Sequence, residues 1–496
     1  MHKGTASRLA RLNGHLSPRV AASEPTAGVV KRLLGSLFGG GGGDDIEPVA
    51  VVESKAHPRQ GVDTGHVHPS ICKTADGTLI IVYAANEDDS PGKDVLMCTR
   101  STDSGATWSV SSPIECTRFS EKPDAVADSD THEVYPGTLT ALPDDRVLCT
   151  WDYTYGKYPD QGRPLLYTIS EDQGQTWGAQ QLIFDPADPP NAKLDVNQHL
   201  GTLRHSILVE DDGRWLLPLT VGGPRGSPTG EGVGTRSLCE WYGLEYPGVQ
   251  IYDPDSGSLE PVPELSPGRE GSHPALEYPI LQLARNGGSG PMLAMGTGNS
   301  GHNQDPPVAP SPAPVLFSGG KGQPWTEVEG FPANVECPDG VKMEEWDGTH
   351  ARCNMSTPRT PYTFALRKLW LYRTERSACD AITDDGDRWG RDLLALADGR
   401  FLVVWVVAGD RSQPSSGIHC CISPDGQTWD GSKTVTLLPD TMVVGRYYQP
   451  KSVQLSDTHI GMVIMKGPQG AMDGIFYLRV PLAMLGSVPE STGTGG

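Results

Sequence analysis

Apolar and polar positions repeat along the chain in a fixed order: a short apolar segment, a polar turn that often contains Asp-Gly, and a second apolar segment. In residues 68–83, Asp76-Gly77 separates two runs rich in aliphatic and β-branched side chains. Runs of this length on either side of a turn signal predict a pair of antiparallel strands. Copies occur at residues 68–83, 135–151, 205–217, 278–295, 391–405 and 449–465.

A second, shorter motif with the pattern Ser-x-Asp-x-Gly-x-Thr-Trp follows several of these pairs. The Asp carboxylate can accept hydrogen bonds from turn N–H groups, Gly supplies a positive φ, and Trp can fold over the loop. The motif therefore predicts the turn of a hairpin. Complete copies lie at residues 101–108 and 170–177, a copy one residue shorter at 423–429, and weaker traces at 318–325 and 383–389.

Together, the two repeats predict an all-β protein that folds as a β-propeller. Each unit would be one four-stranded sheet, in which two inner strands are followed by an outer hairpin closed by the Asp motif. Units of roughly 50–70 residues with four strands are typical of propellers, in which no blade buries both faces alone. We expect six blades over residues 46–486, and the longer interval before residue 391 leaves room for a seventh around residues 361–374.

Composition agrees with a turn-rich body, because Gly 60 and Pro 43 among 496 residues leave little room for long helices. Residues 1–45 are basic and Gly-rich, which predicts a disordered leader or a transit-like segment, and residues 487–496 a disordered tail. We expect no membrane span, because no apolar run reaches the necessary length, and no signal peptide is evident. The compartment and the oligomeric state stay open.

The net charge of −21 argues against a nucleic-acid partner, because phosphate binding requires a basic surface. The ten cysteines contain no CxxC pair, so a structural zinc site is not expected, and disulfides are neither assigned nor excluded. No metal or cofactor motif is recognised. Acidic loops at residues 124–130 and 384–387 could hold calcium, although solvated loops are the simpler interpretation.

The Ser-x-Asp-x-Gly-x-Thr-Trp hairpins, one in each unit after a strand pair, resemble the Asp boxes of the sialidase (neuraminidase) superfamily. The resemblance covers about residues 46–486. It implies a six-bladed propeller and an exo-acting glycoside hydrolase without a cofactor. Such enzymes use three arginines on the substrate carboxylate, a Tyr nucleophile polarised by a Glu, and an Asp as general acid and base. Because Asp boxes lie on the outer rim, they indicate the fold rather than the activity.

The resemblance implies candidate catalytic residues at three positions. Asp89, in an acidic loop before the first Asp motif, is the candidate acid and base. Glu277, at the start of the fourth strand pair, matches the family Glu in register. Alignment on the last pair puts Gln449 in the nucleophile position, so Tyr448 becomes the nucleophile only if one slipped residue or a bulge intervenes.

The three arginines that bind the substrate carboxylate in the family, called the arginine clamp below, are not all matched in this sequence. Val67 occupies the first arginine position, and Gly296 lies where a second would be expected. A shifted clamp could use other cations and polar side chains near the inner strands. The candidates for substrate binding are His66, His68, Arg204, His205, Arg391 and Arg446.

Three functions therefore remain in view. The first is a sialidase-like hydrolase of a terminal acidic sugar with an altered clamp, which we take as the hypothesis. The second is a polysaccharide lyase or a His-dependent glycosidase acting on uronate-containing glycans, because His and Tyr suit proton abstraction beside a neutralised carboxylate. The third is a propeller that binds glycans without catalysis. The expected partner in the first two cases is a glycan or oligosaccharide substrate.

Overall fold

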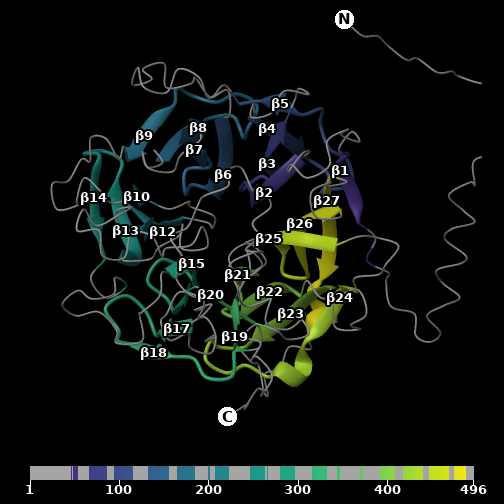
Figure 1. Ribbon diagram of the computed structural model, residues 1–496. Helices are drawn as coiled ribbons and strands as arrows, with labels where there is room; N and C mark the ends of the chain where they lie inside the picture. Colours follow the sequence, from purple (N-terminus) through teal and green to yellow (C-terminus); the bar gives the residue numbers. More distant parts are fainter. Residues whose placement is uncertain are drawn as a thin grey trace, which may run out of the picture. The chain divides into compact units, whose positions relative to one another are not determined.

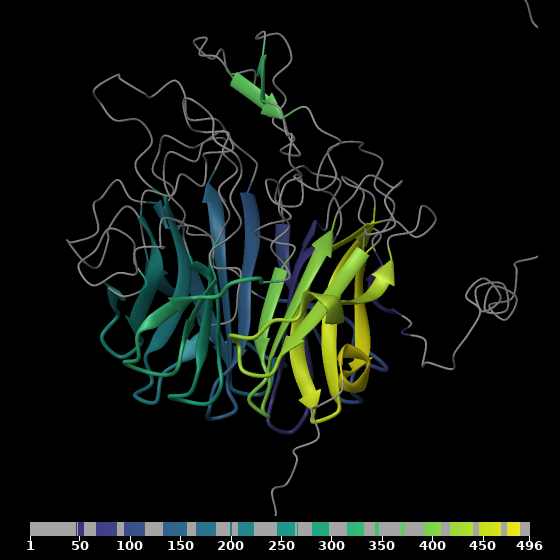
Figure 2. The same cartoon turned by 90° about the horizontal axis from the view of Figure 1, so that it is seen from below.

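The structure is a computed structural model. It describes residues 46, 48–53, 66–86, 94–114, 132–155, 165–184, 199–200, 207–222, 246–262, 265, 280–296, 315–331, 343–346, 369–372, 391–407, 417–439, 446–467 and 474–486, with only the backbone at several strand ends. Residues 46–496 form one compact unit. Within it, six β-sheets are arranged around a common axis as the blades of a propeller (Figures 1 and 2).

Each blade begins with its innermost strand, which lies next to the axis, and proceeds outward. Blade 1 contains β2 (His66–Lys73), β3 (Leu79–Asn86), β4 (Asp94–Ser101) and β5 (Ser112–Pro113). Blade 2 contains β6 (His132–Ala141), β7 (Val147–Tyr155), β8 (Leu165–Ser170) and β9 (Gln181–Phe184). In blade 3, β10 (His199–Leu200) and β11 (Leu208–Val209) share the inner edge, followed by β12 (Trp215–Gly222), β13 (Tyr246–Asp253) and β14 (Ser258–Pro261).

The second half of the propeller repeats this order. Blade 4 contains β15 (Ile280–Arg285), β16 (Met292–Gly296), β17 (Val315–Ser318) and β18 (Trp325–Glu327). Blade 5 contains β21 (Arg391–Ala395), β22 (Phe401–Val407), β23 (Gly417–Ser423), the 3-10 helix η5 (Gly431–Lys433) and β24 (Val435–Pro439). Blade 6 contains β25 (Arg446–Ser456), β26 (His459–Gly467) and β27 (Gly474–Pro481).

The six strand pairs predicted from the hydrophobic pattern are confirmed as the two inner strands of the six blades. The alternative of a seventh blade is wrong. The long interval instead contains β19 (Met343–Trp346) and β20 (Leu369–Tyr372), which form a two-stranded sheet without pairing to any other described strand. A two-stranded hairpin has too little apolar surface to form a blade of its own.

Blade 6 is completed by a strand from the beginning of the propeller. β1 (Val49–Glu53) pairs antiparallel with β27, giving the order β1-β27-β26-β25. The expected outer hairpin is therefore wrong for the last unit, since the chain after β27 forms the 3-10 helix η6 (Leu482–Leu485). β1 covers the edge of β27, which would otherwise present unpaired N–H and C=O groups.

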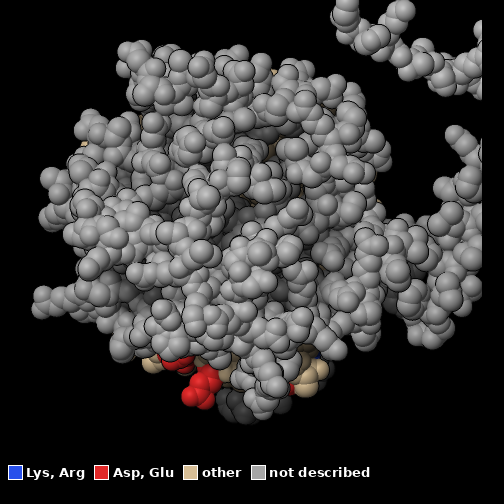
Figure 3. Space-filling view, viewed as in Figure 1, with Lys and Arg blue, Asp and Glu red and all other residues tan. Residues whose placement is uncertain are grey.

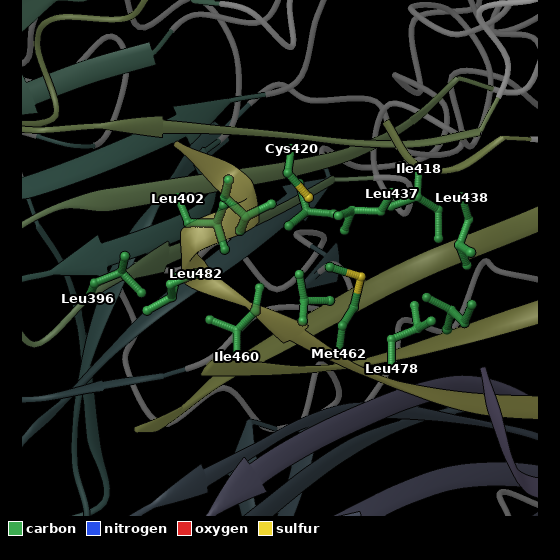
Figure 4. Packing of buried hydrophobic residues seen from close by; sticks show 14 residues of the cluster. Leu396, Leu402, Ile418, Cys420, Leu437, Leu438, Ile460, Met462, Leu478 and Leu482 are labelled. Atoms are coloured by element: carbon green, nitrogen blue, oxygen red, sulfur yellow. The ribbon is translucent and has the colours of Figure 1, made fainter. Parts of the chain in front are cut away.

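Buried side chains gather between the blades, with one hydrophobic cluster at each of the six junctions. β22 shows why its sequence is apolar throughout. Leu402 and Val404 face blade 6, whereas Phe401 and Val403 face blade 4, because successive side chains of a strand point to opposite faces. Figure 4 shows the cluster between blades 5 and 6, where Leu402 and Cys420 lie opposite Ile460 and Met462.

The Asp motifs at residues 101–108, 170–177 and 423–429 connect the third and fourth strands of their blades, as predicted, whereas the weaker trace at residues 383–389 lies outside the described residues. In the first motif, Asp103 Oδ1 accepts from the Thr107 N–H (2.9 Å), and Ser101 Oγ accepts from the Gly105 N–H (2.8 Å). Gly105 has φ +88°, which glycine adopts without strain. Trp108 packs edge-on against Tyr477 of blade 6, with ring centroids 5.3 Å apart. Each such turn therefore also contacts the preceding blade.

Acidic side chains lie in several turns between strands, including Asp103 in the first Asp motif and Asp212 between β11 and β12, and both have lowered pKa values because hydrogen bonds stabilise the carboxylates. Acidic groups are also visible among the described residues at the edge of the face in Figure 3.

No helix among the described residues is both long and apolar enough to cross a membrane.

Candidate functional site

The inner strands of four blades are interrupted near their first residues by β-bulges. The register shifts lie between Val67 and Ser70 in β2, Pro136 and Leu139 in β6, Ile280 and Gln282 in β15, and Tyr448 and Lys451 in β25. A bulge places extra residues opposite the partner strand and changes the direction of nearby side chains. Since inner strands start at the same end of the axis, the bulges mark this end as the part of the propeller that departs from regular pairing.

Neighbouring inner strands are joined by a hydrogen bond between a side chain and a backbone group at each of the six junctions. Such bonds hold the ring of inner strands together and satisfy buried polar groups. The six bonds are Leu139 N–H to Ser70 Oγ (2.9 Å), Ile207 N–H to Thr140 Oγ1 (3.2 Å), Arg285 Nη2 to Val209 O (2.8 Å), Gln282 Nε2 to Arg391 O (2.8 Å), Ser452 N–H to Asp392 Oδ2 (2.5 Å) and Lys73 Nζ to Leu455 O (2.6 Å).

The junction between blades 1 and 6 has an additional contact of a different kind. His68 Nδ1 lies 2.9 Å from Gln449 Oε1, so two side chains on neighbouring inner strands are hydrogen-bonded to each other. Both residues are partly exposed. The bulge also releases the His68 N–H from the strand ladder, and this group donates to Met465 Sδ of blade 6 at 3.0 Å.

Both members of this pair have a backbone conformation that is rare for their residue types. His68 has φ 56° and Gln449 has φ 49°, and each precedes a proline. The left-handed region costs a residue with a Cβ about 1–2 kcal/mol, and a following proline restricts the backbone further. Two strained residues in contact, on two bulges, are the most unusual local feature among the described inner strands.

Blade 5 contributes two charged residues at the same end of the propeller. Arg391 is the first residue of β21 and only 3% exposed, and its Nη1 lies 4.0 Å from Met295 Sδ in blade 4. Asp392 points to the other side, where it accepts from Ser452 and lies 3.6 Å from Lys451 Nζ. The first two residues of β21 thus fill the junctions on either side of blade 5.

The sequence candidates fall into three groups. Asp89, Glu277, Arg204 and His205 lie outside the described residues, the last two between β10 and β11. The backbone alone is described for His66, Arg446 and Tyr448, which lie in β2 and β25 close to the pair. His68 and Arg391 are described with their side chains, and these stay predictions as substrate-binding residues.

The sequence does not by itself indicate that Gln449 or Asp392 binds substrate. The available signal for Gln449 was the His-Pro and Gln-Pro dipeptides near the starts of the first and last strand pairs. An imidazole and an amide can each donate and accept hydrogen bonds, and here the two groups are bonded to each other. Among the described residues, no three His, Cys, Asp or Glu side chains are grouped to hold a metal ion.

Comparison with solved structures confirms the fold. A sialidase described as Hadza microbial sialidase Hz136 superposes with a TM-score of 0.50 at 15% identity, over 88% of this chain and 68% of that one. The NanB sialidase from Streptococcus pneumoniae, in complex with a chlorobenzyl-ammonio-ethanesulfonate, has a TM-score of 0.50 at 10% identity, over 89% and 71%. No protein-family model and no curated protein matches the sequence. The chain therefore has a six-bladed propeller similar to those of sialidases.

Proposed function

We propose that this chain is a glycan-active enzyme that hydrolyses a terminal acidic sugar, with a clamp unlike that of the sialidases it resembles in fold. In this proposal Asp89 is the acid and base, Tyr448 the nucleophile and Glu277 its polarising partner. A neutral Tyr is suited to attack beside a substrate carboxylate, which would repel an anionic nucleophile. His66, Arg204, His205, Arg391 and Arg446 are the proposed groups around the sugar, together with His68.

The bulge in β25 is the observation that carries the proposal. When the last strand pair is aligned with the family on Leu455-Ser456-Asp457, counting back places Gln449 at the nucleophile position, unless one extra residue intervenes. β25 has a register shift between Tyr448 and Lys451, and a second one lies between Gln454 and Ser456, next to the turn. An extra residue at the first of these places moves the position back to Tyr448.

Turnover of a fluorogenic sialoside tests the assignment. We expect Tyr448→Phe, Glu277→Gln and Asp89→Asn each to lower kcat by about a hundredfold or more, the usual effect of removing a group that transfers a proton or electrons. Tyr447→Phe is the matched control, because it removes the same hydroxyl from the adjacent residue and should leave kcat unchanged. Full activity of Tyr448→Phe, or equal losses in both tyrosine variants, would contradict the role of Tyr448.

A second function is favoured by the His68 side chain. Its Nδ1 lies 2.9 Å from Gln449 Oε1, and this contact orients the ring of a residue type that commonly transfers protons. This arrangement suits a lyase that abstracts a proton from a uronate, or a His-dependent glycosidase. Uronate oligosaccharides that yield an unsaturated, ultraviolet-absorbing product, with that product lost in His68→Ala and no turnover of the sialoside, would replace the first proposal by this one.

A further inference from the structure

The first two residues of β21 connect three blades through hydrogen bonds to and from the backbone. On one side, Gln282 Nε2 of blade 4 donates to Arg391 O at 2.8 Å. On the other side, Asp392 Oδ2 accepts from the Ser452 N–H of blade 6 at 2.5 Å. Two consecutive residues therefore fix the start of β21 relative to its neighbouring inner strands, β15 and β25.

Asp392 differs from the other hydrogen-bond acceptors at the six junctions because it carries a charge. The others are hydroxyl or backbone oxygens, as in the bond from the Leu139 N–H to Ser70 Oγ. Hydrogen bonds to an ionised group are roughly twice as strong as neutral ones. The Asp392 carboxylate also lies 3.6 Å from Lys451 Nζ, and the two side chains are 5% and 14% exposed, so salt screens this pair little. Blades 5 and 6 are thus joined by a charged acceptor beside a cation, which the other five bonds lack.

Stability gives little reason for a charge at this place. Removing two ionised groups from water costs about as much as their attraction returns, so a buried ion pair adds little net stability. A hydroxyl can satisfy a backbone N–H between inner strands, as Ser70 does for Leu139. In some proteins, buried ionic and polar groups are retained because they fix how two elements align. Alignment of β25 against β21 is therefore the better explanation for Asp392.

The part of β25 that Asp392 contacts lies directly after the bulge near the start of this strand. Regular pairing with β26 stops at Tyr448 and resumes at Lys451, which is opposite Val463. The strand ladder is disrupted across that gap, so a contact from another blade has a larger effect on the position of the backbone. Asp392 supplies such a contact at the first two residues beyond the gap, Lys451 and Ser452.

We propose that Asp392 is a positioning residue, which holds the strand of Tyr448 at a fixed distance from Arg391. The inference rests on the proposed function, in which Tyr448 is the nucleophile and Arg391 binds the sugar. Asp392 follows Arg391 in β21 and binds β25 four residues beyond Tyr448, so this contact relates the two groups. Groups in an active site must be held within about 0.5 Å of their working geometry, and a displacement of about 1 Å can lower the rate a hundredfold.

The test separates activity from stability, by turnover of a fluorogenic sialoside and by urea unfolding of the full chain. Asp392→Asn keeps an oxygen for the Ser452 N–H but removes the carboxylate from Lys451. We expect this variant to have a lower urea midpoint and a kcat within about threefold of the unaltered chain. The double variant Asp392→Leu with Lys451→Met removes both charges and the acceptor. Apolar replacement of a buried ion pair is often neutral for stability, so we expect a nearly unchanged midpoint and a kcat lowered at least about tenfold.

Thr140→Val is the matched control. It removes the oxygen that accepts from the Ile207 N–H between blades 2 and 3, neither of which carries a proposed catalytic residue, so kcat should not change. A kcat that follows the urea midpoint across the variants would indicate a structural role and overturn the inference. So would a normal kcat in the double variant, or an equal loss in Thr140→Val. No turnover by the unaltered chain would refute the hydrolase and this inference together, whereas full turnover in every variant would refute the positioning role alone.

Discussion

Replacing Gly105 by alanine tests the contact between an Asp-motif turn and the preceding blade. A Cβ at this position would overlap the ring of Tyr477, with only 2.6 Å to Cδ1 and to Cζ. Tyr477 is 1% exposed and belongs to the cluster between blades 1 and 6, so its ring can move only by disturbing that cluster. The backbone adds a second cost, because Gly105 has φ +88°.

The two costs can be estimated separately. A Cβ in left-handed backbone costs about 1–2 kcal/mol, and overpacking a buried cluster costs about 1–3 kcal/mol, so Gly105→Ala should destabilise the propeller by about 2–5 kcal/mol. Gly77→Ala is the matched control. Gly77 has φ +92°, but no atom lies within 4 Å of its would-be Cβ, so only the backbone cost of about 1–2 kcal/mol is expected.

Urea unfolding followed by intrinsic tryptophan fluorescence measures both variants, with the shift in midpoint converted through the measured m-value. A further variant, Tyr477→Leu, makes room for the added methyl group. In the Tyr477→Leu background, Gly105→Ala should cost about as much as Gly77→Ala, because only the backbone cost remains. Equal destabilisation by Gly105→Ala and Gly77→Ala in the unaltered chain would refute the steric argument.

Three further outcomes follow from the charges and thiols. The hydrogen bonds from Thr107 lower the pKa of Asp103 to about 2. The ionised carboxylate therefore stabilises the fold fully above the pKa of about 4 that Asp has in the unfolded chain, and this stabilisation is lost as the pH falls from there to about 2. Asp103→Asn should reduce the dependence of the melting temperature on pH across that range. Burial raises the pKa of the Cys98 thiol to about 12 and that of Cys72 well above its usual value, so mass spectrometry should find both unmodified by iodoacetamide in the native protein and alkylated in urea. Glu210 is 5% exposed and paired with Arg285 at 2.6 Å, so Glu210→Ala should lower the free energy of unfolding by about 3–5 kcal/mol in the same urea titration. Asp212→Ala, which breaks a half-exposed pair, should lower it far less, and similar losses in both variants would contradict the importance of burial.

Much of the fold is predictable because local sequence encodes it repeatedly. The paired strands within one repeat unit, and turns such as Asp103 to Gly105, form between residues that are close in sequence. The hydrophobic pattern and the turn residues therefore identify them. β1 could not be assigned from the sequence in the same way. Val49 pairs with Tyr477, far away in the chain, and no local motif marks a strand whose partner belongs to another unit.

The candidate site was less predictable, since it depends on register. From the sequence, the bulge in β25 could be stated only as the requirement for placing Tyr448 at the nucleophile position. An extra residue in a strand has no reliable sequence signal, and the one local indication here is the following Pro450. The contact between His68 and Gln449 depends on the first and last blades meeting, which is a property of the closed ring. Arg391 is cationic and lies at a strand start, but its burial between blades 4 and 5 follows from packing alone.

The pairing of β1 with β27 also has a consequence for the order of folding. During synthesis, blades 1 to 5 can assemble as their strands leave the ribosome, whereas β1 must wait for the last strand to emerge before it has a partner. Until then, both β1 and the open side of blade 1 are exposed to other chains. The ring therefore closes as a late and separate event, and a nascent chain that stalls before β27 would present the same unpaired strand as a mature chain from which β27 has been cleaved.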